Sequence, residues 1–204
     1  MGEYRHIALK DMIEEIGETK VREVLSNFSC PRNKDVEYFL RHRAIQFSKS
    51  AVAPSHLVFC DLGDNEKLIL CGYFTITRKT FTIPKNCFSK TLQRKFGEFG
   101  TGQAIDGSYE VPAPLIAQLG KNYTDGADLL IRGADLMQIA LDQIAVLQKI
   151  EGGRITYVEC EDKPKLIEFY NSHGFFEFNR RLLDFDEKKN LEGKELIQLL
   201  RYKK

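Results

Sequence analysis

The chain has 204 residues, of which 43% are hydrophobic and 29% are charged, as in an ordinary globular protein. This length suffices for one domain with a substantial buried core. No apolar run approaches the ~18 residues that span a bilayer, and the sequence lacks the pattern of a secretory leader. We therefore expect a cytoplasmic protein without a membrane partner.

The cysteines argue against a protein stabilised by disulfide bonds or by a zinc ion. They are scattered along the chain at Cys30, Cys60, Cys71, Cys87 and Cys160. Their number is odd and no pair has C-x-x-C spacing, so neither a disulfide framework nor a zinc site is expected. We predict reduced, mostly buried thiols and no metal.

The formal charges nearly cancel, with 30 basic and 29 acidic residues, yet one segment is strongly basic. Between Arg78 and Gly97 the chain has six basic residues and no acidic one, which leaves −5 for the rest (1 − 6 = −5). Phenylalanines interleave these basic residues, and that composition suits contact with nucleic acid. Such a run is more often a solvated face, so a nucleic-acid partner stays open without being favoured.

The first part of the chain has the residue spacing of helices. Leu9–Leu25 is predicted to be helical with a break at Gly17. Asn33 has a side chain that can cap a helix starting near Asp35. Apolar residues at helical spacing continue to Phe47, so we expect one continuous helix, and Pro54 marks its end.

The next part has the alternation typical of strands. His56–Leu62 and Leu68–Ile83 are predicted to form a hairpin, and an insertion over about residues 84–108 separates it from a strand over Tyr109–Leu119. Two prolines interrupt this last strand. Because proline cannot donate to a ladder, one side of the strand must be unpaired or bulged.

The remaining elements complete a β-α-β unit and close the sheet. They are predicted as a helix over Gly133–Lys149, a strand over Ile155–Cys160, a helix over Pro164–Ser172 and a final hairpin of Phe175–Phe178 with Glu195–Arg201. Gly174 suits the left-handed position after a helix, and the β-α-β unit should cross over in parallel and right-handed fashion. We predict one α/β (α+β) domain over residues 1–204, with a mixed, mostly antiparallel central sheet and helices on both faces.

Two segments resemble the GNAT family of N-acetyltransferases. APLIAQLGKNY at Ala113–Tyr123 with IRGADLMQIALDQI at Ile131–Ile144 resembles the family's strand, pyrophosphate loop and helix, and VECEDKPKLIEFYNSHGF at Val158–Phe175 resembles its next strand and helix. FSCPRNKDVEYFL near Phe28–Leu40 is similar to the first helices of some members, including toxin-type ones. The resemblance implies the GNAT fold and acetyl-CoA as the cofactor.

The resemblance also implies a cofactor site. A loop that opens a helix presents unpaired N–H groups and the positive end of the helix dipole to a pyrophosphate. The implied cofactor-binding residues are Leu119, Lys121, Arg132, Gly133, Ala134 and Lys163. The sequence departs from the family pattern R/Q-x-x-G-x-G/A, because only Gly133 aligns with a motif glycine. Asp135 is unfavourable at a phosphate site unless its side chain points away from it.

Tyr170 stands in the family's Tyr-x-x-x-Gly-Phe signature, and the resemblance assigns it the catalytic role of protonating the departing thiolate. A phenol with a reference pKa of ~10 is protonated at neutral pH and can serve as a general acid. A tyrosine that is simply part of the core is the alternative. The attacking amine needs a base, and four carboxylates on or beside the central strands stay open for that role. They are Glu110, Glu159, Glu161 and Asp162.

The leading hypothesis is acetyl transfer from acetyl-CoA to an amine by direct attack, with a backbone N–H near Leu119 stabilising the oxyanion. The acceptor is an amine-bearing small molecule or protein, and a homodimer stays open. One alternative is a degenerate GNAT fold that serves as a non-catalytic binding or regulatory module. The second alternative is a toxin-like acetyltransferase acting on aminoacyl-tRNA.

Overall fold

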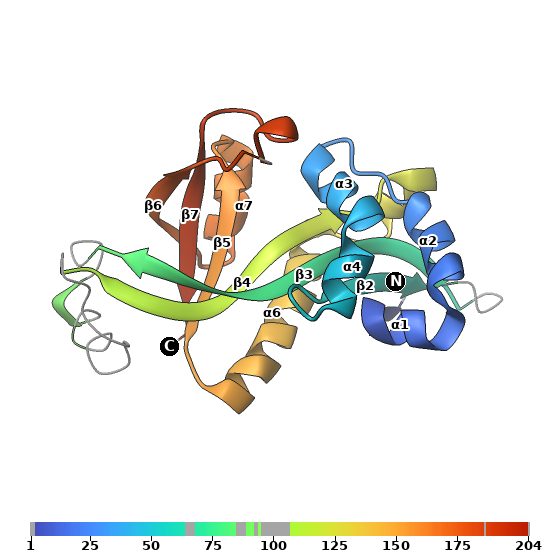
Figure 1. Ribbon diagram of the computed structural model, residues 1–204, viewed down its shortest axis with the longest axis horizontal. Helices are drawn as coiled ribbons and strands as arrows, with labels where there is room; N and C mark the ends of the chain where they lie inside the picture. The colour runs from blue at the N-terminus through green and yellow to red at the C-terminus, as the bar shows by residue number, and fades with distance from the viewer. Residues whose placement is uncertain are drawn as a thin grey trace. The chain divides into compact units, whose positions relative to one another are not determined.

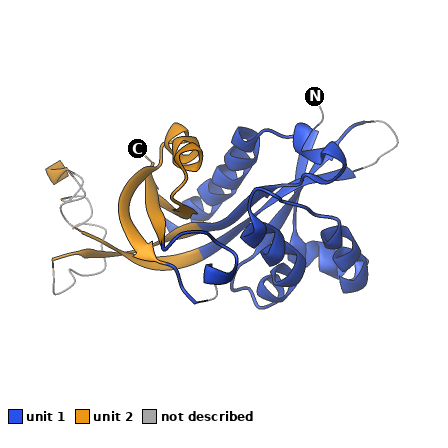
Figure 2. Ribbon diagram, turned by 90° about the horizontal axis from the view of Figure 1, so that it is seen from above, with its two compact units in different colours: residues 1–77, 116–152, 183–194 blue, residues 78–115, 153–182, 195–204 orange. Residues whose placement is uncertain are grey.

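The computed structural model contains a seven-stranded sheet with helices around it (Figure 1). It describes residues 3–63, 68–84, 89–91, 94, 107–185 and 187–203. The strand order is β1-β2-β3-β4-β5-β7-β6. The chain divides into two compact units, coloured separately in Figure 2. Unit 1 comprises residues 1–77, 116–152 and 183–194, and unit 2 comprises residues 78–115, 153–182 and 195–204.

The helices predicted at the start of the chain are confirmed as α1 (Leu9–Ile16) and α2 (Glu18–Ser26). They are separated by Gly17, whose φ of 83° lies in the left-handed region that favours glycine. Before them lies a strand that the sequence analysis missed, β1 (Glu3–Ala8). It pairs antiparallel with β2 at one edge of the sheet. Its residues are mostly half-exposed or exposed, so it lacks the apolar alternation of an inner strand.

The next helical segment begins as predicted but is not continuous. The Asn33 Oδ1 atom accepts hydrogen bonds from the backbone N–H groups of Asp35 (3.0 Å) and Val36, so Asn33 caps α3 (Lys34–His42). The prediction of one helix through Phe47 is wrong. The backbone breaks at Arg43, and α4 (Ala44–Lys49) follows. The break brings Ala44 and Ile45 into the core, beside the buried side chains of α3.

The predicted hairpin is confirmed as β2 (Ser55–Asp61) and β3 (Leu68–Ile83), which pair antiparallel with a bulge after Val58. The predicted insertion over residues 84–108 lies mostly outside the described residues. β4 (Tyr109–Lys121) then runs through both of its prolines as one strand.

Helices cover both faces of the sheet in unit 1 (Figure 2). A Cβ built on Gly120 of β4 would lie 2.3 Å from Cγ1 of Val36 in α3, and one built on Gly72 of β3 would lie 3.1 Å from Cδ2 of Leu136 in α6. The two glycines therefore let a helix approach each face closely. On the α3 face the Tyr73 hydroxyl donates to the Val36 carbonyl at 2.6 Å, which satisfies a fully buried phenol.

The last part of the chain follows the predicted order. Its elements are η2 (Thr124–Leu129), α6 (Gly133–Glu151), β5 (Ile155–Glu161), α7 (Pro164–Ser172), β6 (Phe176–Leu182), η3 (Glu187–Lys189) and β7 (Glu195–Tyr202). β7 lies between β5 and β6 and pairs antiparallel with both. Residues 196–200 of β7 are all buried, as expected for an inner strand with both faces covered. In the described part of the chain, no helix is long and apolar enough to cross a membrane.

Candidate functional site

The predicted site residues fall into two groups, one in each unit. Unit 1 contains the end of β4 and the start of α6, and unit 2 contains α7. The unit 1 group is Leu119, Lys121, Arg132, Gly133 and Ala134. The unit 2 group is Lys163 and Tyr170.

In unit 1, Lys121 holds the loop before α6 in place. Its ammonium donates to the backbone carbonyls of Asp128 (2.6 Å) and Ile131 (2.9 Å). The hydroxyl of Tyr4 donates to the Leu130 carbonyl at 2.9 Å, so β1 fastens the same loop from the edge strand. These contacts satisfy carbonyl groups in a segment with little regular structure. Lys121 therefore fixes the backbone of the predicted pyrophosphate loop by binding two of the loop's carbonyl groups.

The start of α6 has the features of an anion site together with one opposing charge. The amides of Gly133 and Ala134 are in the first turn, where N–H groups lack partners within the helix. The Asp135 carboxylate accepts from Nε (2.8 Å) and Nη2 (2.7 Å) of Arg132, which lowers the pKa of Asp135. Asp135 thus points toward Arg132, and the pair nearly cancels in charge. The 76% exposed Arg132 side chain can still reach a ligand.

In unit 2, Tyr170 lies in the last turn of α7 and is 7% exposed. Its ring makes T-shaped contacts with Phe169 (5.4 Å) and Phe175 (5.7 Å). Gly174, with a φ of 81°, turns the chain so that the Phe175 N–H donates to the Tyr170 carbonyl at 3.2 Å. This confirms the predicted left-handed glycine after the helix.

The Tyr170 hydroxyl is a proton donor that the described residues leave unused. It makes no hydrogen bond to any of them, although the ring is buried. Burial, with a smaller contribution from Cys160, raises the pKa of Tyr170 well above its ordinary value of 10.0. The phenol is therefore protonated at neutral pH. At the other end of α7, the Lys163 ammonium pairs with Glu161 at 3.0 Å.

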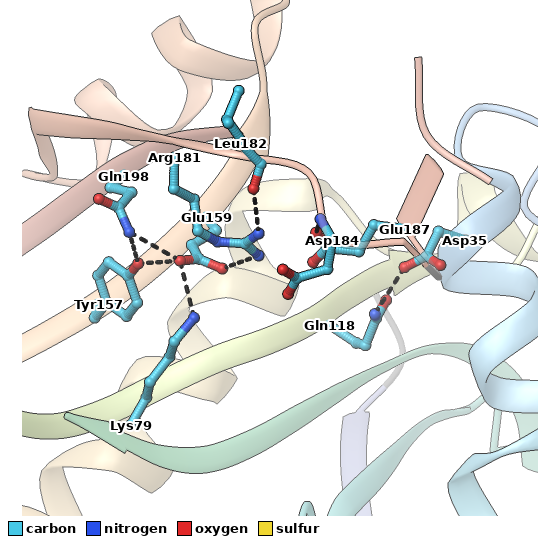
Figure 3. Close-up of polar contacts among 10 residues, drawn as sticks. All are labelled: Asp35, Lys79, Gln118, Tyr157, Glu159, Arg181, Leu182, Asp184, Glu187 and Gln198. Atoms are coloured by element: carbon cyan, nitrogen blue, oxygen red, sulfur yellow. Dashed lines mark hydrogen bonds and ion pairs between the residues drawn. The ribbon is translucent and has the colours of Figure 1, made fainter. Parts of the chain in front are cut away.

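One of the four carboxylates considered as a base belongs to a buried polar network (Figure 3). Glu159 on β5 accepts from Arg181 (2.6 Å), Lys79 (3.1 Å), Gln198 (3.1 Å) and the Tyr157 hydroxyl. Burial alone would raise its pKa, but these hydrogen bonds and the charge of Lys79 outweigh burial and lower the pKa of Glu159 to about 2. A carboxylate that holds a proton so weakly is a poor general base.

The other three carboxylates are less enclosed or already paired. Glu161 forms the ion pair with Lys163, and Asp162 lies 2.7 Å from Nη1 of Arg180. Glu110 is exposed. The structure thus gives Glu159 a structural role without assigning the base. Lys79, Arg181 and Gln198 come from three other strands, and the register of β5 with β7 accounts only for Gln198.

Comparisons with known proteins give structural matches only. No family model and no curated protein matches the sequence. A tyrosine-to-phenylalanine variant of KacT matches with a TM-score of 0.62 at 17% identity, over 96% of this chain and 94% of that chain. AtaT in complex with acetyl-methionyl-tRNAfMet matches with a TM-score of 0.62 at 16% identity, over the same shares.

A third match is a tyrosine-to-phenylalanine variant of the AtaT toxin, bound to the C-terminus of the antitoxin AtaR and to acetyl-CoA. Its TM-score is 0.56 at 16% identity, over 87% of this chain and 84% of that chain. Identities this low show a shared fold and no more. The predicted fold is confirmed, and the chain has the GNAT fold of these structures.

Proposed function

We propose that this chain is an acetyl-CoA-dependent N-acetyltransferase whose acceptor is the amino group of an aminoacyl-tRNA. The observation that carries the proposal is the hydroxyl of the buried Tyr170, which is protonated and makes no hydrogen bond to the described residues. It occurs on a fold shared, over almost the whole chain, with AtaT solved with acetyl-methionyl-tRNAfMet. Charged tRNA is a cytoplasmic substrate, in keeping with the expected location.

The residues at the start of α6 fit the anionic part of the cofactor. The amides of Gly133 and Ala134 and the guanidinium of Arg132 would hold its phosphates, and the pairing of Arg132 with Asp135 moderates that attraction. When bound, acetyl-CoA supplies the acetyl group and leaves as the thiol. A backbone N–H near Leu119 would donate a hydrogen bond to the acetyl oxygen as negative charge develops on it.

Tyr170 would complete the transfer as general acid. The amine nitrogen forms a bond to the acetyl carbon, and the bond from carbon to sulfur breaks. The Tyr170 hydroxyl then gives its proton to the departing sulfur, and the proton lost by the amine passes to solvent and restores the phenol. The KacT structure and the antitoxin-bound AtaT structure described above are tyrosine-to-phenylalanine variants, so one tyrosine hydroxyl is absent from each of those proteins.

A non-catalytic binding module is the competing function, favoured by the charge cancellation between Arg132 and Asp135. Isothermal titration with acetyl-CoA separates the two functions, since an enzyme must bind the cofactor below millimolar concentration. Radiolabelled acetyl-CoA is then offered with aminoacyl-tRNA, deacylated tRNA or a polyamine. We expect label on the aminoacyl group alone. Label on the polyamine would support a small-amine acceptor instead, and no binding at millimolar acetyl-CoA would exclude the enzyme.

A further inference from the structure

Asp35, which the sequence analysis considered only as a helix start, joins three distant parts of unit 1. It lies in the first turn of α3. Its Oδ2 atom accepts from Nε2 of Gln118 on β4 at 3.0 Å, a contact visible in Figure 3. Its Oδ1 atom accepts from Nδ2 of Asn190, just after η3, at 3.2 Å. The three side chains are half-buried.

The charge of Asp35 has only neutral partners. No ion pair links it to any cation in the described ranges, whereas Glu37 on the same helix and Glu18 on α2 each pair with an arginine. A carboxylate offers about four acceptor positions, and the two amides occupy two of them. The position near the start of α3 favours a negative charge through the helix dipole. That preference does not account for two amide side chains that hold the carboxylate from other elements.

The position of Asp35 relates it to the proposed chemistry. Gln118 directly precedes Leu119, and a backbone N–H near Leu119 is proposed to stabilise the developing oxyanion. Gly120 approaches α3 so closely that its Cβ would meet Val36, the residue after Asp35. Strand residues two apart point to the same face, so Gln118 faces α3 as Gly120 does. Asp35 therefore lies over the part of β4 where transfer is proposed to occur.

We propose that the Asp35 carboxylate, framed by Gln118 and Asn190, binds the protonated amino group of the acceptor. The inference rests on the proposed function for the identity of the acceptor. An ammonium group has three donors and one charge, and it would occupy the acceptor positions that the amides leave unused. Asp35 then selects a cationic amine and brings it to the end of β4, where it must lose a proton before it attacks.

The test measures binding, so that it does not depend on turnover. Isotope-labelled protein is titrated with methionine amide at pH 6.5, where an α-amino group with a reference pKa of about 7.7 to 8.0 is mostly protonated. N-acetylmethionine amide, which has no charge, is titrated in parallel. We expect the side-chain amide signals of Gln118 and Asn190 to shift with the cation only. In Asp35→Asn, affinity for the cation should fall roughly 10- to 100-fold.

The matched control is Asp142→Asn, which alters an exposed carboxylate on α6 that accepts from Gln138 at 2.8 Å. It should leave the titration unchanged. A purely structural Asp35 would lower the melting temperature in Asp35→Asn, with equal responses to the charged and uncharged probes. That result, or no shift at either amide in the wild type, would overturn the inference. A parallel acetyl-CoA titration tests the proposed function separately: cofactor binding without a response to the amine counts against Asp35 alone.

Discussion

Two of the buried tyrosines of unit 2, Tyr157 and Tyr170, lie in different kinds of surroundings. Tyr157 on β5 is fully buried, and its hydroxyl both donates to Glu159 and accepts from Gln198 at 2.7 Å. Tyr170 on α7 is packed by aromatic rings, and its hydroxyl has no partner in the described part of the chain. A phenol hydroxyl that both donates and accepts a hydrogen bond within the protein contributes to stability. A hydroxyl that makes no hydrogen bond to the described residues can donate its proton to a bound ligand.

The sharpest test of this comparison is Tyr170→Phe. If the hydroxyl protonates the departing sulfur, kcat should fall roughly 10²- to 10⁴-fold, with little change in KM for acetyl-CoA. The free energy of unfolding should change by less than about 0.5 kcal/mol, because no hydrogen bond to a described residue is lost. Steady-state kinetics and urea unfolding of the same preparation check both parts. Full activity with the true acceptor would remove Tyr170 from the mechanism.

Glu159→Gln tests the network around the other tyrosine. The substitution keeps the size and shape of the side chain but removes the negative charge that pairs with Lys79 and Arg181. The free energy of unfolding should therefore fall by roughly 2–3 kcal/mol. The turnover of the folded fraction should stay normal. Glu177→Gln is the control, because Glu177 forms an exposed pair with Arg180 and should cost less than about 0.5 kcal/mol. A loss of turnover without a loss of stability would return Glu159 to the list of bases.

The same network predicts a pH dependence. The pKa of Glu159 is lowered from its ordinary value of 4.5 to about 2, so its contribution is present above pH 4.5 and is lost as the pH falls toward 2. The difference in unfolding free energy between wild type and Glu159→Gln should therefore shrink by roughly half or more between pH 6 and pH 3. Urea titrations across this range measure it. A constant difference would mean that the pKa of Glu159 is the same in the folded and the unfolded protein.

Tyr157→Phe completes the pair of tyrosine variants. Removing this hydroxyl breaks the contacts with Glu159 and Gln198, so we expect a loss of roughly 1–2 kcal/mol in unfolding free energy with turnover unchanged. Melting temperature and kcat of the two variants then test the comparison: Tyr157→Phe should lower only the melting temperature, and Tyr170→Phe should lower only kcat. Equal effects of both variants on kcat would show that the two phenols do not differ in role.

Gly174→Ala gives the smallest effect. A Cβ at this position would meet only ordinary contact with Arg201, at 3.6 Å, so the cost comes from the φ of 81°. An alanine in the left-handed region costs roughly 1 kcal/mol. Thermal unfolding should show that loss. If α7 still ends at the same residue, kcat should stay above about half of the wild-type value.

The sequence indicated the parts of the fold that depend on local spacing. The bounds of β3, the cap at Asn33 and the left-handed Gly174 are properties of short segments, and each is confirmed. The break at Arg43 was not predictable from apolar spacing, because the same residues suit one long helix. β1 was missed because an edge strand with mostly exposed residues has no clear alternation.

The candidate site was less accessible to sequence reasoning. Tyr170 could be singled out because its motif spans only six consecutive residues, Tyr170 to Phe175. The partners of Asp35 lie 83 and 155 residues away in the chain, so no local pattern relates them. Glu159 could be named as a carboxylate beside the site, but its ion pairs depend on the order in which β5, β7 and β6 lie in the sheet.

That strand order also governs how the protein can form during synthesis. β5 and β6 leave the ribosome before β7, yet they do not pair with each other, since β7 lies between them. A nascent chain that has reached only Lys194 therefore has no strand to pair with β6 and leaves the β7 side of β5 unpaired, and it lacks Gln198 for the Glu159 network. Unit 2 cannot close until β7 emerges, so a partly made chain should be exposed to proteases and should not display an assembled Tyr170 site.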